Sequence, residues 1–282
     1  MVGGDGRLHT TYGQETSTGR LTSASPNLQN IPVKGGLGIE IRKAFVASKG
    51  RSLIAADYSQ IELRIVACLA QDRAMLEAFE QDRDVHAATA AEIFGVGIDQ
   101  VTKDQRRFAK TINFGVLYGM SPYGLSQALG INRQEASRFI KRYFEVHAGI
   151  RHYCNQIIDH ARRQGYVETL FGFRRVMEDI NSSNHSLAEA QERMAVNAPV
   201  QGSAAEILKL AMIQLDKAFT KFPVLHKPQM ILTVHDELVV EVDEKDAEAA
   251  SGVMKSIMES VADLCVPLKV EIGIGANWAE TK

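Results

Sequence analysis

The pattern of apolar and polar positions divides the chain into strand-like ends and a long helical middle. Residues 52–57 form a short apolar run that is typical of a buried strand. Two strand-like runs lie within 229–242, and a last one covers 268–275. Between residues 61 and 219 the apolar positions recur mainly with helical spacing. We therefore expect an α+β protein in which a helical block is inserted into a small, mostly antiparallel sheet.

Capping residues and glycines predict where the helices begin and end. Asp72 is expected to cap a helix that runs through Glu80, and Gly95 to end an Ala-rich helix. Thr102 and Gln105 form a capping box, which predicts a helix from Lys103 to about Tyr118. Further helices are expected at 61–71, from 122 onward, at 136–147, at 151–164, from 186 to a break at Pro199, at 202–219 and at 244–264.

Two segments look different from these helices. The stretch STGRLTSASPNLQNIPVKGGLG, within the first 40 residues, is rich in Ser, Thr, Asn, Pro and Gly and predicts an irregular loop. Loops of this length inside compact domains are usually functional or disordered. The stretch GYVETLFGFRRVM, at 165–177, predicts a short hairpin.

Composition places the chain among ordinary globular proteins. Its 282 residues are 45% hydrophobic and 23% charged, which fits one or two domains with a sizeable core. The apolar runs are too short to span a membrane, and the N-terminus lacks the apolar region of a signal peptide, so we expect a cytoplasmic protein. Cys68, Cys154 and Cys265 are far apart and odd in number, which suggests neither disulfides nor a thiolate zinc site.

The charge balance by itself argues mildly against a nucleic-acid partner. The chain carries 32 Lys and Arg against 34 Asp and Glu, a net charge of −2, whereas phosphate binding favours a basic surface. The average conceals a local bias, because residues 133–175 are rich in basic side chains. These include Arg151, Arg162, Arg163, Arg174 and Arg175.

Acidic residues stand at the ends of strand-like runs. Asp57 ends the first run, and His235, Asp236 and Glu237 interrupt the run at 229–242. A buried carboxylate is costly unless a cation pairs with it. If the strands are neighbours, Asp57 and Asp236 lie at one edge of the sheet, where their oxygens suit Mg²⁺. For either residue alone, a simple turn is the favoured alternative.

The helix expected at 103–118 carries an ordered stripe of side chains. Arg106, Lys110, Phe114 and Tyr118 are spaced by four and span a face about 120° wide. Cations near a helix N-terminus can hold a triphosphate, and aromatic rings can stack on a base. The alternative is a solvated basic end followed by two core aromatics.

Other polar residues are candidates for contacts to nucleic acid. Amides and arginines on an ordered loop can bind phosphates and base edges, although a series of turns is the default explanation without other support. His86 has no histidine or cysteine neighbour and is better explained as helix surface or core than as a metal ligand. The candidates are Arg20, Asn27 and Gln29 in the loop, and Arg193, Asn197 and Gln201 in a later helix.

Taken together, the motifs resemble those of family A DNA polymerases of the bacterial DNA polymerase I type. Three stretches are similar to the polymerase motifs of that family: DYSQIELR at 57–64, RRFAKTINFGVLYG at 106–119 and VHDE at 234–237. Two more, TGRLTSASPNLQNIP and NAPVQGSAAEI, resemble further stretches. The resemblance covers essentially the whole chain in order. It implies a right-hand polymerase fold, with a palm at 1–62 and 191–282 and fingers at 63–190.

The resemblance also implies a function and its residues. It implies DNA-directed DNA synthesis on a primer–template from dNTPs, in replication and repair, by a monomer. Asp57 and Asp236, with the Tyr58 carbonyl, would hold two Mg²⁺ ions, for which Mn²⁺ can substitute, and Glu62 would exclude the 2′-hydroxyl of RNA precursors. Lys110 would also protonate the departing pyrophosphate. Substrate contacts are implied for Tyr58, Gln60, Glu62, His86, Arg106, Lys110, Phe114 and Tyr118, and DNA contacts for Arg20, Asn27, Gln29, Arg193, Asn197, Gln201, His235 and Glu237.

The chain departs from the family at its beginning. Family members usually carry a thumb, and often exonuclease domains, before the stretch that begins at Gly6, so we expect no proofreading and weak DNA affinity. Another segment of a parent protein would then supply the thumb. A natural small polymerase and an engineered truncation both stay open. A fragment that binds dNTP or DNA without efficient turnover is the alternative, and Glu62 argues against an RNA polymerase.

Overall fold

The structure is a computed structural model that describes residues 2–32, 36–222 and 227–282. Internal contacts divide the chain into two units. The sheet unit comprises Met1–Ile61, Ala204–Asp263 and Leu268–Lys282. The helical unit comprises Glu62–Ser203 and Leu264–Pro267. Their assignment as palm and fingers, with boundaries after residues 62 and 190, stays a prediction.

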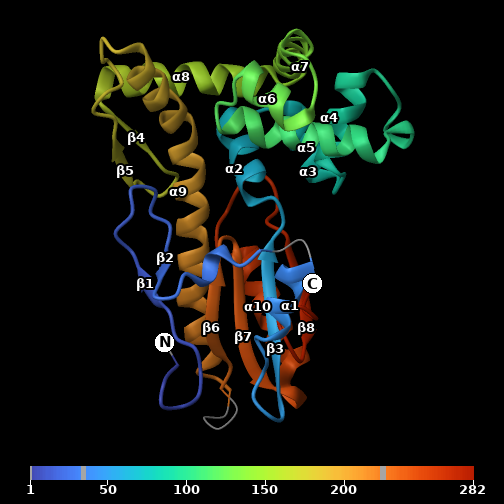
Figure 1. Ribbon diagram of the computed structural model, residues 1–282, viewed down its shortest axis with the longest axis vertical. Coiled ribbons are helices and arrows are strands. Elements are labelled where there is room, and N and C mark those ends of the chain that lie inside the picture. The colour runs from blue at the N-terminus through green and yellow to red at the C-terminus, as the bar shows by residue number, and fades with distance from the viewer. Residues whose placement is uncertain (1, 33–35, 223–226) are drawn as a thin grey trace. The chain divides into compact units, whose positions relative to one another are not determined.

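A four-stranded antiparallel sheet forms the centre of the sheet unit (Figure 1). Its strand order is β6 (Gln229–Val234), β7 (Glu237–Asp243), β3 (Arg51–Tyr58) and β8 (Val270–Gly275). The strand β3 precedes the helical block in the chain, and the other three follow it. The predicted α+β class, with a helical block inserted between the strands of a small sheet, is confirmed.

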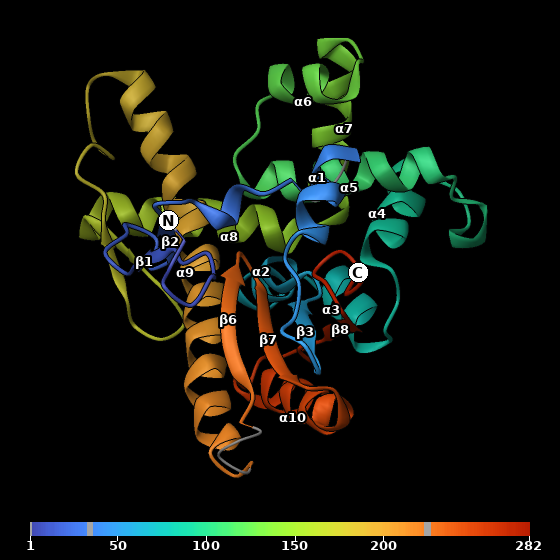
Figure 2. The same ribbon diagram turned by 60° about the horizontal axis from the view of Figure 1, so that its bottom comes forward.

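Alternation along β3 gives the sheet two covered faces. Leu53 and Ala55 point to one face, where they form a core cluster with Val239 and Trp278. Helix α10 (Ala247–Ser260) packs against β3, β7 and β8 on the other face (Figure 2). On that face the Tyr58 hydroxyl donates to the Met258 carbonyl oxygen at 2.8 Å. Such alternation is the pattern expected of a strand buried on both sides.

The turn between β6 and β7 consists of His235 and Asp236, whereas Glu237, which the sequence groups with them, is the first residue of β7. His235 has a φ of 53°, in the left-handed region that tight hairpin turns require. The Tyr58 N–H donates to the Asp236 carbonyl oxygen at 3.2 Å. The end of β3 and this turn are therefore adjacent.

The first 40 residues contain more regular structure than the composition predicts. They form β1 (Thr11–Gly13), β2 (Thr22–Ala24), the 3₁₀ turn η1 (Leu28–Asn30) and the start of α1 (Gly36–Lys43). The Leu28 side chain is buried in the core cluster, and its N–H donates to the Ser23 hydroxyl at 2.9 Å. Long-range burial of this kind is invisible to a local composition rule. Residues 33–35 lie outside the described part.

The helical unit follows the predicted caps closely. Asp72 accepts from the Met75 N–H at 3.2 Å, and Asn132 accepts from the Glu135 N–H at 2.8 Å. The capping box of Thr102 and Gln105 makes both of its hydrogen bonds. The helices are α2 (Ile61–Ala70), α3 (Arg73–Glu80), α4 (Val85–Phe94), α5 (Lys103–Leu117), α6 (Pro122–Leu129), α7 (Arg133–Val146) and α8 (Ala148–Gln164), with η2 (Ile98–Gln100) before α5. The predicted hairpin is present as β4 (Tyr166–Glu168) and β5 (Arg174–Val176).

Helix α9 (His185–Phe219) corrects one prediction, because it continues through Pro199. A proline inside a helix loses one backbone hydrogen bond and clashes with the preceding turn. Buried side chains lie on both sides of it, including Val196 and Val200, and the Ser203 hydroxyl donates to the Pro199 carbonyl oxygen at 2.7 Å. Packing therefore outweighs the local cost. None of the helices in residues 2–32, 36–222 and 227–282 is long and apolar enough to cross a membrane.

The cysteines correct a second prediction. Cys68 in α2 and Cys265 are joined by a disulfide, and their Cα atoms are 5.7 Å apart. The two residues are 197 positions apart in the sequence, so spacing along the chain carried no sign of the contact. Cys154 remains a free thiol, and burial raises its pKa to about 11.

The disulfide predicts a thiol count and a stability change. Unreduced protein in denaturant should expose one reactive thiol of its three cysteines. Because the cross-link closes a long loop, reduction should lower the free energy of unfolding by about 2–5 kcal/mol. Thiol titration and urea unfolding with and without reductant test this. Cys68→Ala should abolish the effect of reductant and Cys154→Ala should preserve it, whereas three reactive thiols before reduction would contradict it.

Candidate active site

Carboxylates meet at the end of the sheet where β3 and β7 lie side by side. Asp57 stands directly opposite Glu237 in the antiparallel register, so the two side chains share one face. The Lys282 ammonium lies between them, 2.9 Å from Asp57 Oδ2 and 2.8 Å from Glu237 Oε2. The indole N–H of Trp278 donates to Glu237 Oε1 at 2.6 Å. Glu237 therefore has a partner for each of its oxygens.

The surroundings of this pair are partly buried and positively charged. Glu237 is buried, whereas the Asp57 side chain is 41% exposed. The Arg42 guanidinium lies 3.7 Å from the centre of the Trp278 ring and is buried. Burial lowers the pKa of Arg42, and the charges of Glu237 and Asp57 oppose that shift. This end of the sheet thus places cations around its acids.

The residues at this end fit a divalent cation. No three His, Cys, Asp or Glu side chains of the described residues converge closely enough to form a complete metal cage. Mg²⁺ does not need one, because it binds one or two carboxylates and takes its other ligands from water and substrate phosphates. The Lys282 ammonium stands in for such a cation, since it contacts Asp57 and Glu237 together. Asp236 is in the adjacent turn.

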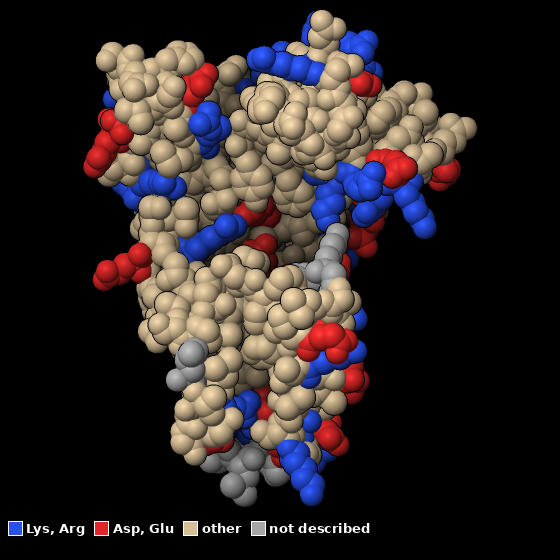
Figure 3. Space-filling model, viewed as in Figure 1, with Lys and Arg blue, Asp and Glu red and all other residues tan. Residues whose placement is uncertain are grey.

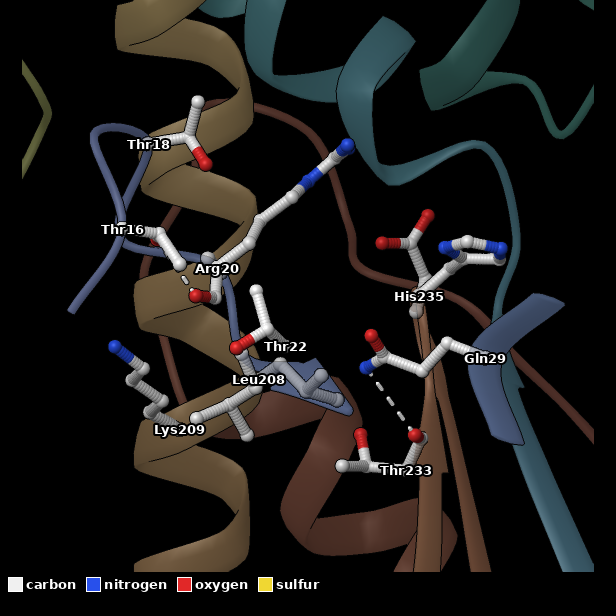
Figure 4. A pocket seen from close by; sticks show the side chains of 12 residues that line it. Thr16, Thr18, Arg20, Thr22, Gln29, Leu208, Lys209, Thr233 and His235 are labelled. Atoms are coloured by element: carbon white, nitrogen blue, oxygen red, sulfur yellow. Dashed lines mark hydrogen bonds between the residues drawn. The ribbon is translucent and has the colours of Figure 1, made fainter. Parts of the chain in front are cut away.

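A hollow of about 270 Å³ opens beside the β6–β7 turn (Figure 4). The Arg20 side chain reaches across it from the loop between β1 and β2. Gln29 donates to the Thr233 carbonyl oxygen at 3.4 Å. The hollow brings together four predicted site residues, namely Arg20, Gln29, His235 and Asp236, with Lys209 and four threonines that were not predicted. Asn27 is not among its lining residues and accepts from the Gln29 N–H at 3.0 Å.

In the helical unit, the first cation of the α5 stripe is anchored to the neighbouring helix. Arg106 Nε lies 2.5 Å from Asp84 Oδ2. Asp84 also caps α4 by accepting from the N–H groups of His86 and Ala87. Burial acts to raise the pKa of Asp84, but the Arg106 hydrogen bond and these N–H groups hold it below its ordinary value. Figure 3 shows Lys and Arg side chains gathered on the helical unit.

His86 is a buried neutral ring next to this cation. Burial, together with the charges of Lys110 and Arg106, lowers its pKa to about 4. The Asn113 side-chain amide donates to His86 Nδ1 at 3.0 Å, so the proton of the neutral ring stays on Nε2. The Phe114 ring lies 5.8 Å from the His86 ring, centre to centre. His86 can therefore offer a hydrogen bond but no charge at neutral pH.

The far end of the stripe is tied to α2. The Tyr118 hydroxyl donates to Glu62 Oε2 at 2.6 Å. Glu62 is 5% exposed, and Tyr118 is 40% exposed. The bond fixes the carboxylate of Glu62, while the tyrosine stays partly exposed to solvent.

The α9 candidates lie in the helical unit. A Cβ on Gly119 would come within 2.4 Å of the Arg193 side chain, so glycine there permits Arg193 to pack closely. Asn197 Oδ1 is buried and has no hydrogen-bond partner among the described residues. Gln60 Oε1, in the sheet unit, is likewise buried and has no hydrogen-bond partner among the described residues. Buried amide oxygens without a partner are costly and suit a site that a ligand completes.

Reasoning from the sequence missed several residues of both units. Trp278 is the only tryptophan in the chain, which could have drawn attention to it. Lys282 and Arg42 gave no local signal, because their contacts to Glu237 and Trp278 depend on the folded chain. Asp84 could have been found as a helix cap, although not as the partner of Arg106.

Curated relatives match nearly the whole chain. DNA polymerase I of Deinococcus radiodurans is 51% identical over 278 residues, which is 98% of this chain and 29% of that protein. The thermostable DNA polymerase I of Thermus aquaticus is 50% identical over 280 residues, covering 98% and 33%. The chain therefore spans about a third of the length of these relatives.

A solved structure agrees with the sequence match. The POL domain of Pol1 from M. smegmatis, in complex with DNA primer-template and dNTP, superposes with a TM-score of 0.95 at 43% identity. The match covers 99% of this chain and 49% of that one. The sequence profile of DNA polymerase family A covers residues 1–280. On the fold, the motifs and this coverage, the chain belongs to DNA polymerase family A.

Proposed function

We propose that this chain catalyses template-directed DNA synthesis, adding dNTPs to the 3′ end of a primer with release of pyrophosphate. The observation that carries the proposal is the antiparallel register of β3 and β7, which brings Asp57 and Glu237 face to face beside Asp236. The M. smegmatis relative, which holds a primer-template and dNTP, supports the same substrates.

In this proposal the sheet unit is the palm and supplies the metal ligands. Asp57, Asp236 and the Tyr58 carbonyl would hold two Mg²⁺ ions, with Mn²⁺ as a substitute. The ions would activate the primer hydroxyl and stabilise the departing phosphate. The protein positions the carboxylates through the paired ends of β3 and β7, so that their geometry is set before substrate arrives.

The helical unit is the fingers and binds the incoming nucleotide. Arg106 and Lys110 hold the triphosphate near the start of α5, where the helix dipole also favours negative charge. Lys110 then gives a proton to the pyrophosphate leaving group, and His86 donates a hydrogen bond from Nε2. Phe114 and Tyr118 contact the base, and Glu62 excludes a 2′-hydroxyl.

The primer–template contacts would come from polar residues of both units. Arg20, Gln29 and His235 line the hollow of the sheet unit, where their donors can reach base edges or phosphates. Asn27, Glu237, Arg193, Asn197 and Gln201 complete the set. Synthesis by this chain would be without proofreading.

A second candidate follows from the length of the chain. Because it spans only 29% and 33% of the two relatives, a segment of the longer protein can contribute to the grip on DNA. In that case the chain alone binds dNTP or DNA without efficient turnover. Nucleotide binding without extension at high enzyme concentration and low salt would favour this candidate.

The proposal predicts which carboxylates extension requires. Asp236→Asn and Asp57→Asn should each lower the rate of primer extension with Mg²⁺ and all four dNTPs by roughly 100- to 1000-fold or more, because a lost carboxylate charge weakens the binding of the metal ions that would stabilise the reacting phosphate. Asp243→Asn is the matched control, because Asp243 stands at the other end of β7 from Glu237. Its carboxylate pairs with Arg51, and the distance between Arg51 Nε and Asp243 Oδ1 is 3.3 Å. Full extension by Asp236→Asn would refute the proposal.

The Tyr118–Glu62 hydrogen bond predicts sugar selectivity. Glu62→Ala should raise the incorporation of ribonucleotides relative to deoxyribonucleotides by roughly tenfold or more, because the 2′-hydroxyl is no longer excluded. Tyr118→Phe should have a smaller effect in the same direction, since it removes only the hydroxyl that fixes Glu62. Single-nucleotide incorporation kinetics give both ratios. Glu77→Ala, which breaks the exposed pair with Arg73, should change neither.

The lowered pKa of His86 predicts that the free energy of unfolding decreases as the pH falls. Its pKa is lowered by burial from 6.5 to about 4, so the unfolded chain takes up the proton first as pH falls. The stability that the neutral ring contributes is therefore present above pH 6.5 and lost toward about pH 4. The free energy of unfolding, measured with urea, should fall less steeply between pH 7.5 and 4.5 in His86→Gln than in the wild type. The exposed His185→Gln should match the wild type, and equal slopes for His86→Gln would contradict the assignment.

A further inference from the structure

The segment after β8, residues 276–282, is built into the sheet unit, and we call it the C-terminal turn. Trp278 is fully buried, and its backbone N–H donates to the Phe45 carbonyl oxygen at 2.9 Å. The Thr281 hydroxyl donates to the Trp278 carbonyl oxygen at 2.9 Å. The Ala276 N–H donates to Glu280 Oε2 at 3.0 Å. These bonds close the turn on itself and anchor it to the core.

Two glycines of β8 leave room for the C-terminal turn. A Cβ on Gly273 would lie 2.0 Å from the Thr281 carbonyl oxygen, and one on Gly275 would lie 2.6 Å from Glu280 Cβ. Real Cβ atoms essentially never approach so closely, so any side chain at either position would push the turn away from the strand. The last residues are therefore held in place by the strand beneath them.

The C-terminal turn places a cation on Asp57, a ligand of the proposed metal site, and on the neighbouring Glu237. Lys282 Nζ contacts Asp57 Oδ2 at 2.9 Å and Glu237 Oε2 at 2.8 Å. Trp278, from the same turn, takes the other oxygen of Glu237. A divalent cation at Asp57 would need the lone pairs that the ammonium now uses, and the two cations would repel each other.

Of the two cations described here near Glu237, Lys282 has more freedom to move than Arg42. Arg42 is buried, stacked on the Trp278 ring, and bonded through Nε to the Pro32 carbonyl oxygen at 3.3 Å. The Lys282 side chain is 35% exposed, and a lysine stem is flexible. It can therefore leave Asp57 for water while Trp278 keeps its bond to Glu237.

We propose that Lys282 is a displaceable counter-cation, which neutralises Asp57 and Glu237 in the metal-free protein and competes with the divalent cation for Asp57. This deepens the proposed function, because it rests on Asp57 being a metal ligand. Lys282 thereby sets the affinity of the site for metal before substrate binds. When a metal ion enters, the ammonium moves away and its charge no longer offsets that of the acids.

Metal binding without DNA or nucleotide tests the competition. Mn²⁺ titration of the whole chain, followed by electron paramagnetic resonance, measures the affinity without any turnover. Lys282→Met should bind Mn²⁺ roughly fivefold tighter or more, within the usual range of coupling between competing ligands. Lys282→Arg retains the charge and should stay near the wild type. Unchanged or weaker binding by Lys282→Met would overturn the proposal.

Stability gives a second, independent measurement. In chelator, Lys282→Met should melt at a lower temperature than the wild type, because two carboxylates then face each other without a cation. Added Mn²⁺ should raise its melting temperature more than that of the wild type. An equal rise in both would count against the competition. Gly273→Ala leaves Lys282 intact but displaces the turn, and should also tighten Mn²⁺ binding.

Two control variants separate this proposal from the proposed function. Arg7→Met removes the ion pair with Glu241, which lies on β7 like Glu237 and is 2.9 Å from Arg7. This variant should leave the Mn²⁺ affinity unchanged. Asp57→Asn should abolish Mn²⁺ binding. If Asp57→Asn binds Mn²⁺ normally, the metal site of the proposed function is wrong. If Asp57→Asn loses binding while Lys282→Met equals the wild type, only the role of Lys282 is wrong.

Discussion

The balance of charge at one end of the sheet constrains the rest of the sheet unit. The register of β3 and β7 sets Asp57 and Glu237 opposite each other, and like charges directly opposite destabilise a sheet. A slip of that register by one residue would exchange the two packed faces of β3 and break the hydrogen bond from the Tyr58 hydroxyl to the Met258 carbonyl oxygen. The specific packing of the two faces therefore holds the acids opposite each other, and the Lys282 ammonium offsets their charge.

Strand β7 carries two buried glutamates that are neutralised in different ways. Burial acts to raise the pKa of Glu241, but hydrogen bonds from Arg7 and Ser48 hold it below its ordinary value. Arg7, Arg51 and the Ser48 N–H together hold that carboxylate, as in a structural ion pair. Glu237 is instead held by a neutral indole and by the flexible ammonium of Lys282. The contacts of Glu241 suit a structural role. The contacts of Glu237 allow the Lys282 ammonium at this end of β7 to be exchanged for another cation.

Local rules in the sequence predicted most helices and strands, because caps and periodicity act over a few residues. The capping box at Thr102 and the turn at His235 are examples. The failures depend on distant partners. Pro199 lies inside a helix because packing on both sides outweighs its local cost, and Cys68 finds Cys265 only in the folded chain. The carboxylates were found from their motifs, whereas Lys282 needed the path of the C-terminal turn.

The most direct test of this account is a crystal structure of the chain with primer–template, an incoming dNTP and Mn²⁺, analysed by anomalous scattering. The account predicts manganese peaks within ligand distance of the Asp57 and Asp236 carboxylates, with the Lys282 ammonium no longer on Asp57. Manganese bound elsewhere, with Lys282 still bridging Asp57 and Glu237 in the substrate complex, would contradict the central claim that these acids form an exchangeable cation site.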